Sequence, residues 1–347
     1  MVSVFGAGSI AASLVGGYLA DRFGRKRTLL LSLFGGAIAM TGLGLVHELP
    51  AITVMVGVVG FVSELYRPAV AAIVADVVPA AHRVQAYALL HWVINIGFSV
   101  AVIIGGLLAS IDFTILFIAD AATMAIYGAI VWVAVPETRP AVVSHTEERP
   151  SRSWVTDGAF VAFVVIVFAM ALMPFQSSAP LSAHMTWQGF SPAAFGAVMS
   201  MNGILIIVLQ PTVSAWAARR EPTRVLVAAA LFYGVGFAIH GLAGSIALHA
   251  AAVMVWTMGE ILESGTRAAL VAAMAPPDAR GRYQGALSMT FGAAQLVGPK
   301  LGTWVWEREG PSVLWGGCLA LGVVVALALI ATAPGRNRRI VEGLRIA

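Results

Sequence analysis

The sequence predicts an all-α integral membrane protein made of two helical bundles that are parallel repeats, with about eleven transmembrane helices divided five and six. Composition is the first observation: the 347 residues are 59% hydrophobic and 11% charged, whereas soluble domains carry roughly 25% charged residues. The second observation is that apolar stretches of spanning length recur along the chain. The third is a repeat, because a shift of 197 residues places Arg22 on Arg219 and Pro79 on Pro276.

The apolar stretches define the predicted helices. A spanning helix needs about 20 mainly apolar residues, and a backbone in lipid must satisfy its own hydrogen bonds, so these stretches are expected to be helical. The first stretch runs directly into Asp21 and Arg22 without the start and cleavage site of a signal peptide, so we predict no cleavable signal. In order along the chain, the candidate spans are residues 2–20, 28–46, 51–77, 86–109, 113–135, 157–176, 192–216, 224–243, 246–274, 283–306 and 312–333.

The basic residues predict the topology. When the chain is threaded alternately through the bilayer, all of the 21 lysines and arginines except Arg67, Arg267, Lys300 and Arg308 fall on one side. Loops rich in arginine and lysine remain in the cytoplasm. We therefore expect Met1 outside, the C-terminus in the cytoplasm, and a multi-pass protein of the inner (plasma) membrane.

The repeat divides the chain into two halves. The shift that pairs Pro79 with Pro276 also pairs Arg83 with Arg280 and spans about six helices, so orientation is preserved and the repeats are parallel, as in one known transporter architecture. Under this shift, the span 157–176 of the second half corresponds to positions before Met1. The first half therefore has five spans and the second has six. The predicted domains are an N-terminal half at 1–135, a cytoplasmic linker at 136–153, a C-terminal half at 154–335 and a basic tail at 336–347.

Several enzyme and cofactor signatures are absent from the sequence. Cys318 is the single cysteine, which excludes an intrachain disulfide and a cysteine-based metal spacing. No P-loop, H-E-x-x-H pattern or nucleophile elbow occurs. The net charge of +4 reflects the loops and does not indicate a nucleic-acid partner, because the position of basic residues matters more than their sum in a membrane protein. We therefore predict no enzyme activity, no metal and no cofactor.

Residues 17–27, GYLADRFGRKR, concentrate charge in a chain that is otherwise almost uncharged. Basic residues beside a bilayer gain about 1 kcal/mol each from anionic lipid, and Gly24 suits a tight turn. Neither effect explains Asp21, an acid on the positive side, or Gly17, which lies four residues earlier on the same helix face. The pattern that requires explanation consists of Gly17, Asp21, Arg22, Gly24, Arg25 and Lys26.

This pattern resembles the signature loop between the second and third helices of the major facilitator superfamily. The resemblance covers nearly the whole chain and implies two six-helix halves joined by a cytoplasmic loop. It also implies that Asp21 is a gating residue supported by Arg25 and Lys26. A degenerate second copy runs from Ser214 to Arg224, with Ala218 in place of the acid and Glu221 in place of the turn glycine.

The resemblance also points to a branch and shows two departures. Residues 64–69, ELYRPA, resemble the drug-efflux-type branch. By this mapping the family's first helix is not in this chain, which begins in the second. The G-P-x-x-G-G pattern that drug–proton antiporters tend to carry on the fifth helix is also missing from its usual position. Its better copy lies in the second half and predicts a helix bend at Gly298, Pro299 and Gly302.

Ionisable residues within the spans are candidate site residues, because each costs several kcal/mol in lipid. Glu64 and Arg67 are three residues apart and either form a structural pair or line a cavity. Glu260, Glu263 and Arg267 lie on the equivalent span of the second half. Glu260 is surplus to the pair that Glu263 can form with Arg267, so Glu260 or Glu263 either carries a transported proton or makes a structural hydrogen bond.

His91 and Asn95, four residues apart, are either possible cavity-lining residues or satisfied polar residues of the core. Taken together, the residues predict a secondary active transporter that exports a small organic compound or drug by alternating access, driven by a proton gradient. Two alternatives remain open. One is an uptake transporter for a sugar or metabolite, and the other is a truncated, non-transporting membrane subunit.

Overall fold

Helices make up every regular element of the part of the chain that the computed structural model describes, which is residues 2–109, 112–139 and 153–346. Met1 and most of the predicted linker 136–153 lie outside the described residues. The first six helices are α1 (Val2–Phe23), α2 (Arg25–Leu45), α3 (Leu49–Glu64), α4 (Tyr66–Val77), α5 (Arg83–Ala109) and α6 (Phe113–Ala134). The next seven are α7 (Gly158–Ala171), α8 (Ala179–Trp187), α9 (Pro192–Ala217), α10 (Pro222–Leu242), α11 (Ile246–Met274), α12 (Arg280–Glu309) and α13 (Pro311–Ile346).

The predicted spans are confirmed with local differences. Among the described residues, ten helical stretches are long and apolar enough to cross a membrane. The helix α12 is outside this set because its middle is less apolar than that of the other helices, but its 30 residues reach about 45 Å and contain the predicted span 283–306. The span 51–77 is divided into α3 and α4 at Leu65, because Pro68 has no N–H to bond the carbonyl of Glu64.

The helix bounds repeat with the shift of 197 residues found in the sequence, which confirms the parallel repeat. Gly24 and Glu221 are both the capping residues before a helix, and they are related by this shift. The matching stretches are Arg25–Leu45 with Pro222–Leu242, Leu49–Val77 with Ile246–Met274, and Ala80–His82 with Pro277–Ala279.

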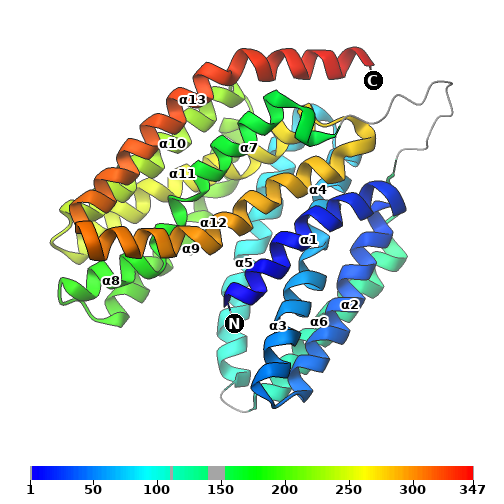
Figure 1. Ribbon diagram of the computed structural model, residues 1–347, viewed down its shortest axis with the longest axis horizontal. Coiled ribbons are helices and arrows are strands. Elements are labelled where there is room, and N and C mark those ends of the chain that lie inside the picture. The colour runs from blue at the N-terminus through cyan, green and yellow to red at the C-terminus, as the bar shows by residue number, and fades with distance from the viewer. Residues whose placement is uncertain (1, 110–111, 140–152, 347) are drawn as a thin grey trace.

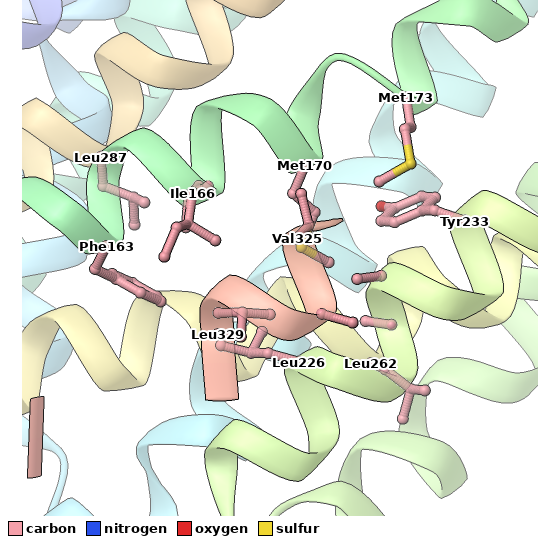
Figure 2. Packing of buried hydrophobic residues seen from close by; sticks show 14 of the residues in the cluster. Phe163, Ile166, Met170, Met173, Leu226, Tyr233, Leu262, Leu287, Val325 and Leu329 are labelled. Atoms are coloured by element: carbon pink, nitrogen blue, oxygen red, sulfur yellow. The ribbon is translucent and has the colours of Figure 1, made fainter. Parts of the chain in front are cut away.

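Two bundles are visible in Figure 1, one of α1 to α6 and one of α7 to α13. Contacts between the bundles are made chiefly by α12 on α1 and α4, and by α5 on α9 and α11. Figure 2 shows the core of the second bundle, where Phe163 and Met170 of α7 point toward Leu226 of α10 and Val325 of α13. The largest buried cluster of the described residues therefore lies within the second bundle, and the surfaces between the bundles are candidates for a site that changes when the bundles move.

Asp157, immediately before α7, ties three helices of the second bundle together. Its carboxylate caps α7 by accepting from the N–H of Phe160 at 3.2 Å, and it also accepts from Tyr283 Oη at 2.9 Å and Arg339 Nε at 2.7 Å. Burial alone would raise the pKa of Asp157, but the hydrogen bonds from Arg339, Phe160 and Tyr283 lower it below the usual value.

This lowered pKa predicts acid-sensitive stability of the second bundle. The stabilisation is fully present above the usual carboxyl pKa of about 4 and is lost as the pH falls through the lowered pKa. We expect Asp157→Asn to cost about 1.5–3 kcal/mol at neutral pH, as for a hydrogen bond to a charged group. Thermal melting of the purified protein and the variant between pH 7 and pH 3 checks this. The two melting temperatures should converge at acid pH, and a constant difference would contradict the prediction.

Candidate functional site

The first candidate site lies where the turns α1–α2, α4–α5 and α11–α12 meet. We call it the latch and define it as Asp21, Arg25, Asp76, Arg280 and Arg282. The carboxylate of Asp21 accepts from the backbone N–H groups of Gly281 at 2.8 Å and Arg282 at 2.9 Å. These are N–H groups of the first turn of α12, where a helix favours negative charge. Asp21 therefore holds α1 of the first bundle to α12 of the second.

Arg25 is the centre of the latch and is 0% exposed. Its Nε lies 3.0 Å from Asp76 Oδ2, and its Nη2 lies 3.5 Å from Asp21 Oδ1. Arg280, from the second bundle, reaches the other oxygen of Asp76 at 2.6 Å. Arg25 also donates to the carbonyl of Pro277 at 3.2 Å. Two carboxylates and three arginines are thus joined across the two bundles.

The other residues of the predicted loop motif have different partners. Gly24 has φ +113°, a conformation that only glycine adopts easily, and an added Cβ would lie 2.2 Å from Glu137 Oε2. Lys26 donates to the carbonyl of Trp132 at 2.6 Å within the first bundle. Arg22 is exposed and contacts Tyr18. In the structure only Asp21 and Arg25 of the motif's charged residues therefore reach the second bundle.

Gly17 allows α1 and α12 to approach closely. A Cβ at Gly17 would lie 2.4 Å from the carbonyl oxygen of Gly281, and a Cβ at Gly281 would lie 2.5 Å from that of Gly17. Both of these contacting atoms belong to the backbone, so they cannot rotate away as a side chain can. The latch therefore depends on glycine at this crossing as well as on charge.

Gly17→Val is expected to separate the bundles at the latch. Overpacking costs about 1–3 kcal/mol, which corresponds to a roughly 5–150-fold change in a two-state equilibrium. Spin labels at positions 27 and 278, both exposed and placed in a Cys318→Ser background, should report a longer mean distance in the variant. Gly196→Val is the control, because a Cβ at Gly196 meets nothing within 4 Å. Unchanged distances in Gly17→Val would be contrary to this expectation.

The second candidate site lies within the helices, away from the turns that form the latch, and it also joins the bundles. Glu260 Oε1 of α11 lies 3.6 Å from His91 Nε2 of α5. Asn202 of α9 donates to Glu260 Oε2 at 2.9 Å and to Thr257 Oγ1 at 3.1 Å. The side chains of His91 and Glu260 are 26% and 24% exposed. We call this group, together with Gln210, the midplane network.

Gln210 of α9 connects His91 to the second bundle. Its Oε1 lies 3.2 Å from His91 Nδ1, while its Nε2 donates to Ser264 Oγ at 2.9 Å and to the carbonyl of Ala88 at 3.3 Å. Trp92 adds a hydrogen bond from Nε1 to the carbonyl of Ile207 at 2.8 Å. Asn95 donates to the carbonyl of His91 at 2.9 Å. His91 and Asn95 thus belong to a polar contact between the bundles.

The remaining predicted charges form ion pairs. Glu64 pairs with Arg67, with Arg67 45% exposed and Glu64 12% exposed. Glu263 pairs with Arg267 and also accepts from Tyr233 Oη at 2.9 Å. Among the described residues, Glu263 contacts an arginine, whereas Glu260 contacts Asn202 and His91. Their roles in proton transfer stay predictions.

The predicted bend residues lie within α12, which runs through Pro299 without a break. Gln176 donates from Nε2 to the carbonyls of Leu172 at 2.8 Å and Gly298 at 3.1 Å. A Cβ at Gly302 would lie 1.7 Å from Gln176 Oε1. Gly298 and Gly302 therefore allow the irregular segment between α7 and α8 to pack closely on α12. The bend itself stays a prediction.

Sequence reasoning did not single out Asp76, Arg280 and Arg282 of the latch, or Gln210 and Asn202 of the midplane network, as site residues. Asp76, Gln210 and Asn202 are single polar residues in apolar stretches, and this isolation is the signal that could have found them. No group of three or more histidine, cysteine or acidic side chains is placed to hold a metal ion in the described part of the chain.

The sequence matches the Major Facilitator Superfamily family model over residues 1–299 and 158–342. It is 25% identical over 331 residues to the uncharacterized MFS-type transporter YttB of Bacillus subtilis, covering 93% of this chain and 82% of the relative. It is 26% identical to the Na(+), Li(+), K(+)/H(+) antiporter of Planococcus maritimus, covering 84% of this chain and 77% of that protein.

A solved structure shares the fold. The human organic anion transporter MFSD10 superimposes with a TM-score of 0.80 at 17% identity, covering 94% of this chain and 83% of that one. The family match extends over most of the sequence, and the helices repeat in two parallel bundles. The chain is therefore a member of the major facilitator superfamily, a multi-pass membrane transporter and not an enzyme.

Proposed function

We propose that this transporter exports a small organic compound in exchange for protons by alternating access, with Glu260 and His91 forming the proton-binding site. The coupling needs a group in the membrane that exists with and without a proton. It also needs that group to respond to the relative position of the bundles. The midplane network supports both requirements.

One observation carries this proposal: Glu260 lies between the bundles and has no arginine partner among the described residues. Glu64, Glu263, Asp21, Asp76 and Asp157 each contact an arginine in the described structure. Glu260 instead faces Asn202 and His91. Because His91 comes from the opposite bundle, a proton carried by Glu260 would be linked to bundle movement.

The latch supports the alternating-access part of the proposal. Asp21, Arg25 and Asp76 are buried where α1 and α4 meet α12. Opening a path to the midplane network from this side requires these contacts to separate. The latch would therefore close one face of the transporter, and the basic turns around it favour the cytoplasmic face.

The substrate class rests on a sequence resemblance and on the names of relatives. The sequence resembles the drug-efflux-type branch at residues 64–69, and relatives include the multidrug resistance protein MdtH of Salmonella arizonae, 23% identical over 328 residues. The antiporter of Planococcus maritimus is named for monovalent cations. We therefore place an organic compound first and make sodium, lithium and potassium arms of the test. The absence of the family's first helix stays a prediction.

The test is transport by the purified protein in vesicles. Acid-loaded vesicles should accumulate an organic substrate from a compound panel while a trapped dye reports rising internal pH, and a protonophore should stop both signals. Empty vesicles are the control. Accumulation of a compound together with protons would instead establish uptake. Proton-coupled export would be refuted by transport at the same rate with and without a proton gradient. It would also be refuted if no compound or cation were transported.

A further inference from the structure

We propose that Gln210 is a positioning residue that fixes the tautomer of His91, so that His91 and Glu260 bind one proton as a pair. This inference rests on the proposed proton-coupled function and deepens it. Gln210 is 1% exposed and comes from α9 of the second bundle, whereas His91 comes from α5 of the first.

The orientation of the Gln210 side chain follows from its partners. Its amide nitrogen lies 2.9 Å from Ser264 Oγ and 3.3 Å from the carbonyl oxygen of Ala88. A carbonyl oxygen only accepts, so the NH2 group must face Ala88 and the amide oxygen must face away from it. That oxygen lies 3.2 Å from His91 Nδ1. Gln210 therefore presents an acceptor to the histidine ring.

An acceptor at Nδ1 determines which ring nitrogen carries the proton. The hydrogen bond made by one nitrogen of a histidine sets the state of the other. With the proton on Nδ1, neutral His91 presents the lone pair of Nε2 toward Glu260 Oε1, 3.6 Å away. A lone pair facing an ionised carboxylate is unfavourable, and one added proton between them removes the repulsion. Gln210 thus raises the proton affinity of the pair.

The other groups near His91 do not supply this selection. Asn95 Nδ2 lies 3.4 Å from Nδ1 and 3.2 Å from Nε2, so it favours neither nitrogen. No charged residue or histidine occurs between residues 192 and 217 of α9. On α11, Glu263 is held by Arg267. On α4, which also packs on α5, Arg67 and Asp76 have their own ion pairs. The helix α6 packs on α5 as well, and its charged residue is Asp120.

Removing the acceptor predicts an acid shift in transport. In Gln210→Leu, neutral His91 is free to carry its proton on Nε2 and to donate it directly to Glu260. The pair is then satisfied without an extra proton, so its proton affinity falls. We expect the pH of half-maximal transport in vesicles to move about one unit toward acid, which corresponds to a tenfold change in proton affinity. Gln210→Met, also without an amide, should give the same shift if the leucine variant does not fold.

Two matched variants separate positioning from packing. Trp92→Phe removes another hydrogen bond between α5 and α9 but leaves both nitrogens of His91 in place. It should alter the transport rate at most and leave the half-maximal pH unchanged. Gln210→Glu keeps an acceptor for Nδ1 and should not shift the profile toward acid.

The outcomes separate a failure of this inference from a failure of the proposed proton-coupled function on which it rests. An acid shift in Gln210→Leu or Gln210→Met, with Trp92→Phe unchanged, supports the inference. A pH-dependent wild type with an unshifted Gln210 variant overturns the inference and leaves the proposed function intact, as does an equal shift in Trp92→Phe. A wild type without pH-dependent transport overturns both.

Discussion

Glu260→Gln is expected to abolish proton-driven transport while leaving folding and substrate exchange intact. Glutamine has the shape of a protonated glutamate and can still accept from Asn202, which lies 2.9 Å from Glu260 Oε2. It cannot release a proton, so the variant would stay in the protonated state of the cycle. In acid-loaded vesicles, accumulation should fall to the level of empty vesicles. Exchange of labelled for unlabelled substrate at equal pH should continue.

The control for this prediction is Asp120→Asn. Asp120 is another membrane carboxyl, on α6, which packs on α2 and α5, and it has no arginine partner among the described contacts. Its replacement should leave proton-driven accumulation within a factor of about two, as for a residue outside the site. Full proton-driven accumulation by Glu260→Gln would remove Glu260 from the proposed mechanism. Loss in both variants would indicate a general effect of removing carboxyl groups.

Arg25→Ala is expected to have the largest effect on stability. Arg25 is 0% exposed and its guanidinium contacts both Asp21 and Asp76. Removing one partner from a buried ionic group costs about 3–5 kcal/mol, because the remaining charges are left without full compensation. Arg25→Lys should restore little of the lost stability, because an ammonium group cannot reproduce the planar set of hydrogen-bond donors of a guanidinium. The measurement is the free energy of unfolding from denaturant melts in detergent.

Arg27→Ala is the matched control, because Arg27 is two residues further along the same turn and is exposed. Its replacement should change the free energy of unfolding by about 0.5 kcal/mol or less. Equal stability of Arg25→Ala and the wild type would mean that the latch contributes nothing to the folded state. Equal losses in both variants would assign the effect to the turn as a whole.

The fold could be predicted because lipid imposes a simple rule on the backbone. Spans such as 28–46 and 224–243 were recognisable by length and apolar content alone, and the shift of 197 residues that places Arg22 on Arg219 and Pro79 on Pro276 predicted the parallel repeat. The division of the span 51–77 at Leu65 was not predicted, although Pro68 marks it in the sequence. The helix α12 was predicted despite its less apolar middle, because the stretch is long enough to span.

The candidate sites were predictable as residues but not as contacts. Asp21 and Arg25 were singled out by the loop motif between two predicted spans, whereas His91 and Glu260 were singled out because charge and polarity are rare within the spans. Their partners depend on how distant helices pack. Asp76 bonds arginines that lie 51 and 204 residues away in sequence, and no local pattern encodes that separation.

The repeat has an energetic consequence, because the two copies are alike in backbone and unlike in charge. The residue shift places Ala218 opposite Asp21, Pro222 opposite Arg25 and Ala273 opposite Asp76. Because the repeats are parallel, the second copy lies on the same face as the first, and it cannot add a matching ionic contact there. The closed face is therefore held by one ionic copy, and the other half cannot compensate for the loss of its charges. Substrate and proton binding must then supply the free energy that opens this face.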